Sequence, residues 1–536
     1  MMPVFTSIVA LSALFTAASP VPTHASDSVA IAPVTAPAIH YTISMPDPES
    51  HLYSVTIDVG NVKGTVLKFQ MPVWSPGRYA RMDFAKNVQE FSVTDGNANA
   101  LRWDRENGSL WRVYPAASHR VVVHYRVFAD DLSGTFSVLD TLHANWNGGS
   151  VFMYVADRKP SAVTLHIDSP AGWHIINGDT QQVDQTDYTF ENYDRLIDTP
   201  TEVAPSFMVD SFTVDNRLYR TVVHHNGPTT PAERARFVES IRKIVEAHNR
   251  VVGPPPLRMY TFLIHVGFPG GDGMEHLYST QIIDREPWVD TASVLAGVET
   301  AAHEYFHVWN VKRIRPIALG PFDYTREQYQ PSLWVAEGWT QYYGEMATSR
   351  ARLGSTADTY AMIAGIVQAN LTAPGRKEVS ARMASFEAPF FDGAPRAQKT
   401  NASQTFFTYY FKGAGIALAL DLMIRDQTDN ARSLDDALRN LKKLSWDMPS
   451  ASYYLQGRGY TEGDVERAVS KAMGKDMHSW FEQYVGGTRD IDFDQILGLA
   501  GLKLDRSGAR WAVSEAPDAS ARQVSIRDVW LADSHE

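Results

Sequence analysis

The stretch Ala302–His307, with the sequence AHEYFH, carries histidines at positions 303 and 307 and a glutamate at position 304. We predict that it belongs to a helix over residues 294–312, because this range contains no proline and no inconveniently placed glycine. Positions i and i+4 share one face of a helix, so the imidazoles of His303 and His307 can reach one metal ion. The carboxylate of Glu304 can approach the same ion from the same side.

This pattern predicts the centre of a metal-dependent hydrolase. A zinc ion lowers the pKa of a coordinated water toward about 7, and the Glu304 carboxylate can then accept its proton as a general base. The alternative is a surface helix with two solvated histidines, because three fixed positions can match by chance in a chain with 17 histidines. The other features of the sequence favour the metal site.

A hydrolytic zinc site needs a third protein ligand and one open position. Residues 332–351, SLWVAEGWTQYYGEMATSRA, form a second segment that we predict to be helical, and Glu337 within it completes a set of two histidines and one glutamate. Glu345 lies two turns further along nearly the same face and is the competing ligand. We therefore predict one zinc ion per chain, held by His303, His307 and Glu337.

The composition limits the other possibilities. A chain of 536 residues is too long for one ordinary core, so we expect two or three domains. The net charge of −12 makes a nucleic-acid partner unfavourable. The chain has no cysteine, which excludes disulfides, thiolate metal sites and thiol catalysis. Any metal must therefore be held by histidines and carboxylates.

The N-terminal residues resemble a secretory signal. Residues 1–25 contain no charged side chain, residues 4–18 are mostly apolar, and Thr23-His24-Ala25 offers small residues at a cleavage point. The positive charge that usually precedes such a run is missing, and a disordered or buried N-terminus is the alternative. We expect cleavage after Ala25 and a periplasmic or secreted location. The apolar run is too short and proline-interrupted to favour a membrane span, so no stable membrane insertion of the mature chain is expected.

The organisation changes along the chain. Residues 26–39 have the composition of a linker, and short segments of alternating β-branched and aromatic residues over residues 40–215 predict an all-β domain, of the sandwich type. Residues 231–251 have helical spacing, and residues 258–266 are typical of a strand that runs into a glycine-rich stretch. Helical patterns dominate residues 291–487, with capping boxes at Ser433/Asp436 and Thr461/Asp464. The tail, residues 489–536, receives no assignment.

Four motifs in a fixed order carry a resemblance to the gluzincin aminopeptidases: Met-Glu-His at 274–276, HExxHxWN at 303–310, WxxEG at 334–338 and YxKG at 410–413. The longer runs HEYFHVWNVKRIRP (303–316) and PVWSPGRY (72–79) resemble the glycyl aminopeptidase family in particular. The resemblance covers residues 40–490. It implies a multidomain α+β protein that removes N-terminal residues from peptide substrates, with small ones such as glycine and alanine favoured.

The same resemblance implies a division of the chain. A β-sandwich-like N-terminal domain would cover residues 40–215, a thermolysin-like catalytic subdomain residues 216–350, and a helical C-terminal subdomain residues 351–488. Many relatives carry a PDZ-like module after the catalytic part, and the segment 489–536 is too short to hold it.

The resemblance also implies roles for residues outside the metal centre. Glu275 follows the glycine-rich stretch, and its carboxylate would bind the α-ammonium group of the substrate. Backbone groups of Gly271 and Gly273 are candidates for hydrogen bonds to an extended substrate. Tyr410 would stabilise the developing oxyanion, with Tyr409 as the competing phenol in an otherwise core-like aromatic run. The pair His224-His225, before a turn-prone Asn226-Gly227-Pro228, receives no role.

Two alternatives to an aminopeptidase stay open from the sequence. A zinc endopeptidase would use the same metal and the same general base, and Glu275 is the feature that distinguishes the two, because only an exopeptidase needs an anion for the free amine. An inactive peptide-binding protein on a peptidase fold is the other alternative. The presence of Glu304 argues against it, since a protein without catalysis has no need of the base.

Overall fold

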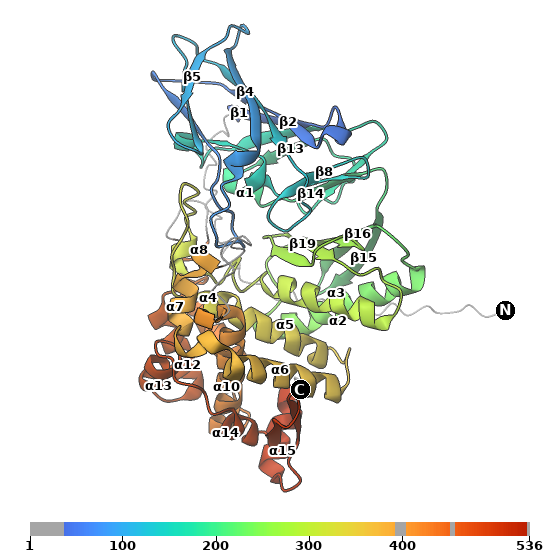
Figure 1. Ribbon diagram of the computed structural model, residues 1–536, viewed down its shortest axis with the longest axis vertical. Helices are drawn as coiled ribbons and strands as arrows, with labels where there is room; N and C mark the ends of the chain where they lie inside the picture. The colour runs from blue at the N-terminus through green and yellow to red at the C-terminus, as the bar shows by residue number, and fades with distance from the viewer. Residues whose placement is uncertain (1–36, 392–403, 451–455, 533–536) are drawn as a thin grey trace, which may run out of the picture. The chain divides into compact units, whose positions relative to one another are not determined.

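A computed structural model of the chain describes residues 37–391, 404–450 and 456–532 (Figure 1). The expected signal segment, residues 1–25, and most of the expected linker lie outside the described residues. Pro37–Glu536 forms one compact unit. It contains β-sheets in its N-terminal part and helices in its C-terminal part, which confirms the predicted α+β class.

Three sheets make up the N-terminal part. The six-stranded sheet has the order β13-β11-β1-β2-β7-β4, with β1 Ile39–Ser44, β2 Leu52–Val59, β4 Val88–Asp95, β7 Val121–Phe128, β11 Val163–Asp168 and β13 Asp187–Phe190. The second sheet has the order β10-β3-β6-β5, with β3 Leu67–Gln70, β5 Arg102–Arg105, β6 Leu110–Tyr114 and β10 Tyr154–Val155. The third has the order β12-β14-β9-β8, with β8 Ser137–Leu139, β9 Ala144–Trp146, β12 His174–Asn177 and β14 Thr201–Ala204.

Strand β2 illustrates why these segments form sheets. Its alternate residues Tyr53, Val55, Ile57 and Val59 are all buried, while the residues between them are partly exposed. A period of two places all of the apolar side chains on the face that covers the core. Strands β7 and β11 show the same alternation, so the predicted strands of this region are confirmed.

A fourth sheet, of five strands, carries the candidate site. Its order is β15-β16-β17-β19-β18, with β15 Met208–Val214, β16 Arg217–His225, β17 Met259–Val266, β18 Asp272–Glu275 and β19 Ser279–Asp284. Strands β16, β17 and β19 are parallel, and β18 is an antiparallel edge strand. All residues of β17 are buried, as expected for the centre of a covered parallel sheet. Because β15 pairs with β16, this sheet begins before residue 216, within the range that the sequence assigned to the β domain.

Helices α2 Pro231–Val252 and α3 Thr291–Phe306 pack against this sheet. The other helices up to residue 350 are α1 Tyr193–Ile197, which precedes the sheet in the chain, α4 Leu333–Ala336 and α5 Gly338–Arg350. The later ones are α6 Thr356–Thr372, α7 Ala381–Phe386, α8 Ala388–Phe391, α10 Tyr409–Thr428, α11 Leu434–Leu444, α12 Glu462–Met473, α13 His478–Tyr484, α14 Phe493–Gly498 and α15 Ala521–Ala532. The capping boxes predicted at Ser433 and Thr461 begin α11 and α12. None of the described helices combines the length and apolarity that a membrane span requires.

The tail after residue 488 joins the same unit. It forms α14, a two-stranded sheet of β20 Leu502–Asp505 and β21 Ala512–Glu515, and α15. Trp530 of α15 is fully buried and donates a hydrogen bond from Nε1 to the hydroxyl of Tyr342 in α5 at 2.8 Å. The tail is therefore packed against the helix that follows Glu337.

Glycines allow α4 and α5 to approach α10 closely. A Cβ atom at Gly413 would lie 2.2 Å from the carbonyl oxygen of Trp334 and 2.7 Å from the Cα atom of Gly338. Both neighbours are backbone atoms, which cannot rotate away. Gly365 in α6 offers a contrast, because nothing lies within 4 Å of a Cβ atom there.

We predict opposite effects of alanine at these two helical glycines. Gly413→Ala should lower the free energy of unfolding by about 1–3 kcal/mol, because the added methyl group forces the helices apart. Gly365→Ala should raise it by about 0.5–1 kcal/mol, because alanine restricts the unfolded chain and meets no obstacle in the helix. Urea unfolding of both variants and the wild type measures the difference. Equal effects of the two substitutions would contradict the close approach of these helices.

Candidate active site

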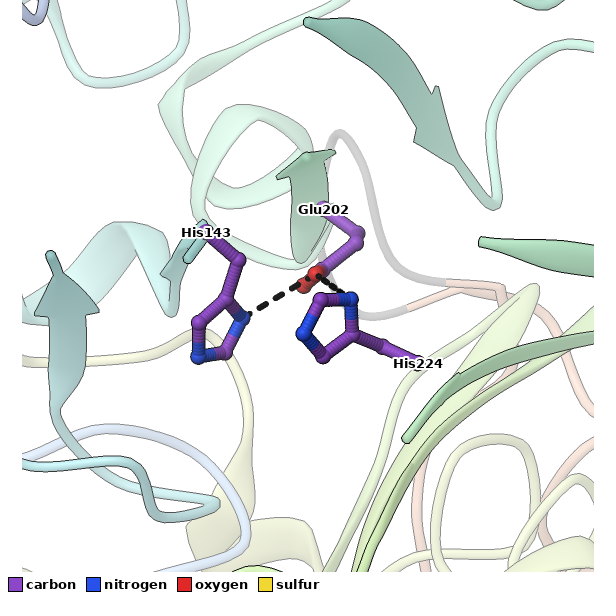
Figure 2. A group of neighbouring side chains, drawn as sticks. All are labelled: His143, Glu202 and His224. Atoms are coloured by element: carbon purple, nitrogen blue, oxygen red, sulfur yellow. Dashed lines mark hydrogen bonds and ion pairs between the residues drawn. The ribbon is translucent and has the colours of Figure 1, made fainter. Parts of the chain in front are cut away.

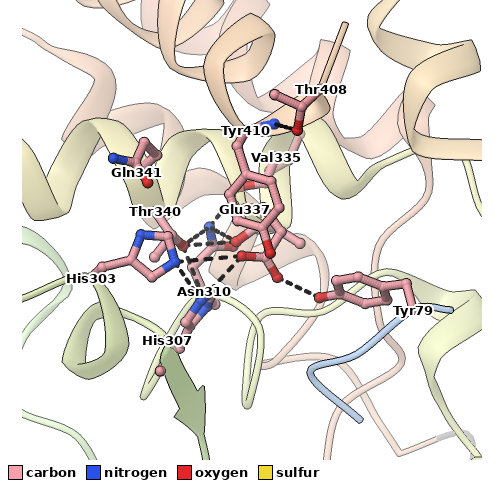
Figure 3. Close-up of polar contacts among 12 residues, drawn as sticks. Tyr79, His303, His307, Asn310, Val335, Glu337, Thr340, Gln341, Thr408 and Tyr410 are labelled. Atoms are coloured by element: carbon pink, nitrogen blue, oxygen red, sulfur yellow. Dashed lines mark hydrogen bonds and ion pairs between the residues drawn. The ribbon is translucent and has the colours of Figure 1, made fainter. Parts of the chain in front are cut away.

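The side chains of His303, His307 and Glu337 meet at one point (Figure 3). The Nε2 atoms of the two imidazoles lie 3.1 Å apart. Oε2 of Glu337 lies 3.3 Å from Nε2 of His307 and 3.6 Å from Nε2 of His303. His307 and Glu337 are buried, and His303 is partly exposed at the wall of a cleft.

These separations fit the requirements of a zinc ion. Bonds of 2.0–2.2 Å in a tetrahedral arrangement place neighbouring ligand atoms about 3.3 Å apart. The three measured separations bracket this value, and imidazole nitrogen with carboxylate oxygen is a donor set that suits zinc. The expected competitor Glu345 does not join the group: its carboxylate accepts a hydrogen bond from Gln341 Nε2 at 2.5 Å.

Local backbone conformation brings the three ligands together. Helix α3 ends at Phe306 instead of continuing to residue 312 as expected, and the chain turns after His307. The His307 ring donates a hydrogen bond from Nδ1 to the Asn310 carbonyl oxygen at 2.6 Å. This bond takes the Asn310 carbonyl out of the helical hydrogen-bond pattern, and it directs the other ring nitrogen, Nε2, toward Glu337.

Asn310 also fixes the segment that carries Glu337. Its Nδ2 group donates to the carbonyl oxygen of Val335 at 2.8 Å and lies 3.1 Å from the hydroxyl of Thr340. The expected single helix over residues 332–351 is divided at Glu337 into α4 and α5. The break directs the Glu337 carboxylate at the histidines, and the Asn310 carboxamide holds both halves against the turn that follows α3.

Tyr79 is a further member of the site that sequence reasoning did not assign. Its hydroxyl donates a hydrogen bond to Oε1 of Glu337 at 2.5 Å, on the carboxylate oxygen that does not face the histidines (Figure 3). The residue lies in the PVWSPGRY run of the β domain. The run carried the family resemblance, but a tyrosine in a loop offers no pattern that predicts which carboxylate it meets.

The loop that contains Tyr79 also contacts β18, the edge strand of the sheet that carries the candidate site. The Arg78 N–H donates to the Ser75 carbonyl oxygen at 3.0 Å, and Gly77 has a φ of +90°, which a turn with proline before glycine requires. The Arg78 guanidinium pairs with the Asp272 carboxylate and lies 3.2 Å from the Gly273 carbonyl oxygen. A Cβ atom at Gly77 would lie 2.1 Å from Met274 Sδ and 2.7 Å from Glu275 Oε2.

Glu304 is buried beside the metal ligands, and its Oε2 atom has no hydrogen-bond partner among the described residues. Burial raises the pKa of the Glu304 carboxyl well above its usual value, and the carboxylates of Glu275 and Glu337 raise it further against the opposing effect of His307. A Cβ atom at residue 273 would lie 2.2 Å from Oε1 of Glu304. Any residue larger than glycine at position 273 would therefore collide with the Glu304 side chain.

The pKa values of the ligands reflect their mutual proximity. Burial disfavours the protonated form of His307, but the Glu337 and Glu275 carboxylates outweigh burial and raise its pKa to about 10. Burial opposes ionisation of Glu337 as well, and the His307 and His303 imidazoles nevertheless hold its pKa well below the usual range. His307 and Glu337 together thus hold a proton that a bound cation would displace, so metal binding should release protons.

Glu275 lies at the end of β18 and is buried. Its carboxylate, that of Glu304 and one nitrogen of His307 lie within 4.8 Å of one another. The expected substrate-binding carboxylate is therefore brought to the metal ligands. Of the two glycines expected to contact substrate, Gly273 is at the cleft, but its N–H already donates to Asp272 Oδ1 at 3.0 Å. Gly271 lies outside the set of residues that line the cleft.

Tyr410 and Tyr409 begin helix α10 and face different surroundings. Tyr410 lines the cleft, with its ring centroid 6.2 Å from that of His303, and Figure 3 shows it beside Glu337. Tyr409 is buried, and its ring packs edge-on against Tyr79 with centroids 6.3 Å apart. Tyr410 is therefore the phenol that is placed at the cleft.

The cleft has a volume of about 720 Å³ and passes over all of these groups. Its walls include the three candidate metal ligands, Glu275, Glu304, Gly273 and Tyr410.

The basic residues that follow the candidate metal ligands make structural contacts. Lys312 pairs with Asp198 at 2.9 Å, and Arg313 donates to the Val308 carbonyl oxygen at 2.7 Å. His276 also contacts Asp198, with Nδ1 3.1 Å from Oδ1.

Comparison with known proteins identifies the family. The family described as the Peptidase M61 N-terminal domain matches residues 40–205, and the M61 glycyl aminopeptidase family matches residues 296–416. Together the two matches span more than half of the chain, which belongs to the M61 glycyl aminopeptidase family and is a metallopeptidase of the aminopeptidase type. This finding confirms the resemblance seen in the sequence. No curated protein matches the chain.

Solved structures share the fold. An aminopeptidase N family protein from Idiomarina loihiensis has a TM-score of 0.79 at 24% sequence identity, covering 87% of this chain and 79% of that one. An M1 zinc metallopeptidase from Deinococcus radiodurans has a TM-score of 0.48 at 14% identity, covering 84% of this chain and 93% of that one. The first similarity shows that the β and helical parts occur together in a known peptidase fold.

We predict that Tyr79→Phe weakens zinc binding by about 10–100-fold, the usual effect of removing a partner that orients a metal ligand. The matched control is Tyr343→Phe, which removes a similar buried hydrogen bond, at 2.8 Å to Asp435, away from the ligands. Competition with a chelator of known affinity measures the dissociation constant in each variant. The control should bind zinc like the wild type. Equal weakening in both variants would show that the loss is a general effect of destabilisation.

Proposed function

We propose that the protein is a zinc-dependent aminopeptidase that removes small N-terminal residues, such as glycine or alanine, from peptides. His303, His307 and Glu337 would hold one zinc ion per chain. The separations among their ligand atoms, 3.1–3.6 Å, support this assignment. The preference for small residues is supported by the glycyl aminopeptidase description of the family.

Each residue at the cleft has a distinct part in the proposed reaction. When bound, zinc supplies a Lewis acid that polarises oxygen atoms and makes water more acidic. Glu304 accepts the proton of the attacking water and passes it to the leaving amine, a role that suits a buried carboxyl with a raised pKa. Tyr410 donates a hydrogen bond to the oxygen that gains negative charge during attack.

The position of Glu275 is the observation that carries the exopeptidase assignment. Its carboxylate lies within 4.8 Å of the proposed base, so the substrate amine it binds would lie next to the peptide bond that is attacked. The turn at Gly77 packs against Met274 and Glu275, and this close packing supports a substrate whose N-terminus lies at the Glu275 carboxylate. A free ammonium group in this buried place needs a negative partner, because an unpaired charge is costly to bury.

The zinc endopeptidase remains the second candidate. It would use the same metal ligands and the same base, and it would need the cleft to accept residues on both sides of the cleaved bond. The packing of the Gly77 turn against Met274 and Glu275 opposes that arrangement.

We also propose export of the mature chain to the periplasm or the medium. The proposal is supported by the uncharged, mostly apolar residues 1–25 and by the small residues that end them.

Glu275→Gln should lower kcat/KM for peptides with a free N-terminus by about 10–100-fold, the effect of losing one charge-assisted hydrogen bond. Residual cleavage of the matched N-acetylated peptide should change little, because that substrate has no charge to bind. The control is Glu345→Gln, which alters another carboxylate of the cleft wall, one that is partly exposed and accepts a hydrogen bond from Gln341. It should keep the wild-type preference for the free peptide.

Two results distinguish the candidates. Wild-type enzyme that cleaves the acetylated peptide as well as the free one would replace the aminopeptidase with the endopeptidase. An intact preference for free peptides in Glu275→Gln would keep the exopeptidase and remove Glu275 from amine binding.

A further inference from the structure

The imidazoles of His143, His224 and His265 surround the Glu202 carboxylate, away from the candidate metal ligands of the active site, and Figure 2 shows the first two of them. His143, His265 and Glu202 are buried, and His224 is partly exposed. His143 directly precedes β9, Glu202 belongs to β14, and His224 and His265 are paired residues of β16 and β17. No role is predicted for His224 from its sequence context before a turn-prone segment, and the structure places it in β16 of the sheet that carries the candidate site. The cluster therefore joins the third sheet of the N-terminal part to the catalytic sheet.

The distances between the ligand atoms of this cluster are similar to those among His303, His307 and Glu337. Nδ1 of His143 lies 3.1 Å from Oε1 of Glu202, and Nδ1 of His224 lies 3.6 Å from the same oxygen. The ligand atoms of these three residues all lie within 4.8 Å of one another. The second carboxylate oxygen, Oε2, is 2.9 Å from Nε2 of His265.

The Nδ1 atom of His224 is buried and has no hydrogen-bond partner among the described residues. This nitrogen faces the Glu202 carboxylate (Figure 2). It lies 3.6 Å from Oε1 of Glu202, which is longer than a hydrogen bond.

We propose that His143, Glu202 and His224 form a second metal site, which binds a divalent transition-metal ion such as zinc and joins the two sheets. An ion at this place is attracted by the carboxylate and accepts the unused lone pair of His224. Tetrahedral zinc places its ligand atoms about 3.3 Å apart, and the two separations from Oε1 of Glu202 lie on either side of this value.

The residues around this cluster provide a hydrogen bond to the carboxylate and an apolar cover, as is common around metal ligands in proteins. His265 donates to the second oxygen of Glu202 and so fixes the carboxylate, as partners of metal-bound carboxylates commonly do. The Phe268 ring covers the cluster, with its centroid 5.3 Å from that of His143 and 5.4 Å from that of His224. This apolar cover keeps water away and strengthens the attraction between ion and ligands.

A network without metal is the competing explanation. Burial disfavours a charge on His143, but the Glu202 carboxylate outweighs burial and raises the pKa of the imidazole. A protonated His143 could then neutralise Glu202 alone. That arrangement leaves the His224 nitrogen without a partner, whereas an ion satisfies His143, His224 and the carboxylate together.

The test counts zinc ions on full-length protein that has been freed of metal with a chelator and titrated with zinc chloride. Wild type should bind two ions per chain. His224→Gln and His307→Gln should each bind one, and the double variant should bind none, because each substitution removes a ligand of a different site. His225→Gln is the matched control, since His225 is exposed and its Nδ1 contacts the Gly227 carbonyl oxygen at 2.9 Å. It should bind two.

Thermal unfolding gives a second measure that does not depend on activity. Zinc should raise the Tm of His307→Gln, whose second site is intact, and should leave the Tm of the double variant unchanged. Should His224→Gln fail to fold by circular dichroism, His143→Gln serves in its place with the same expected counts. Equal zinc counts in wild type and in a folded His224→Gln or His143→Gln variant would overturn the second site. A count of two in His307→Gln would overturn the proposed catalytic ligand and leave the second site standing.

Discussion

The carboxylates of Glu275, Glu304 and Glu337 are buried close to one another, and this concentration of like charge is the constraint on which the site depends. Such a group is stable only if cations or protons balance it. The pKa values of His307 and Glu304 are raised in response, so the protein holds protons where they compensate the charge. In the proposed mechanism, a divalent cation at His303, His307 and Glu337 would balance the same charge and leave Glu304 to act as the base.

The N-terminal β part contributes to the active site. Its turn at residues 75–78 packs against edge strand β18. The Tyr79 hydroxyl donates a hydrogen bond to the Glu337 oxygen that the histidines do not face. Arg78 ties the same turn to Asp272. The residues that pack against Glu275 and Glu337 thus come in part from a region that contains none of the proposed metal ligands. This arrangement explains why the two parts pack as one compact unit.

Much of the site could be predicted from the sequence because its chemistry depends on local spacing. The i, i+4 spacing of His303 and His307 requires only one helical turn, and the alternating pattern of β2 reveals its buried face. Features that depend on tertiary contacts could not be predicted. The break of the helix at Glu337 comes from Asn310, which is distant in sequence, and the contact of Tyr79 with Glu337 spans two domains. The histidine cluster around Glu202 was missed for the same reason, since its members come from separate strands.

The central claim is that one zinc ion lies between His303, His307 and Glu337. Anomalous diffraction from crystals of the zinc-loaded protein, recorded on both sides of the zinc absorption edge, tests it directly. We expect a strong anomalous peak within bonding distance, about 2.0–2.2 Å, of Nε2 of both histidines and of Oε2 of Glu337. A zinc-loaded crystal with no peak among these three side chains would contradict it.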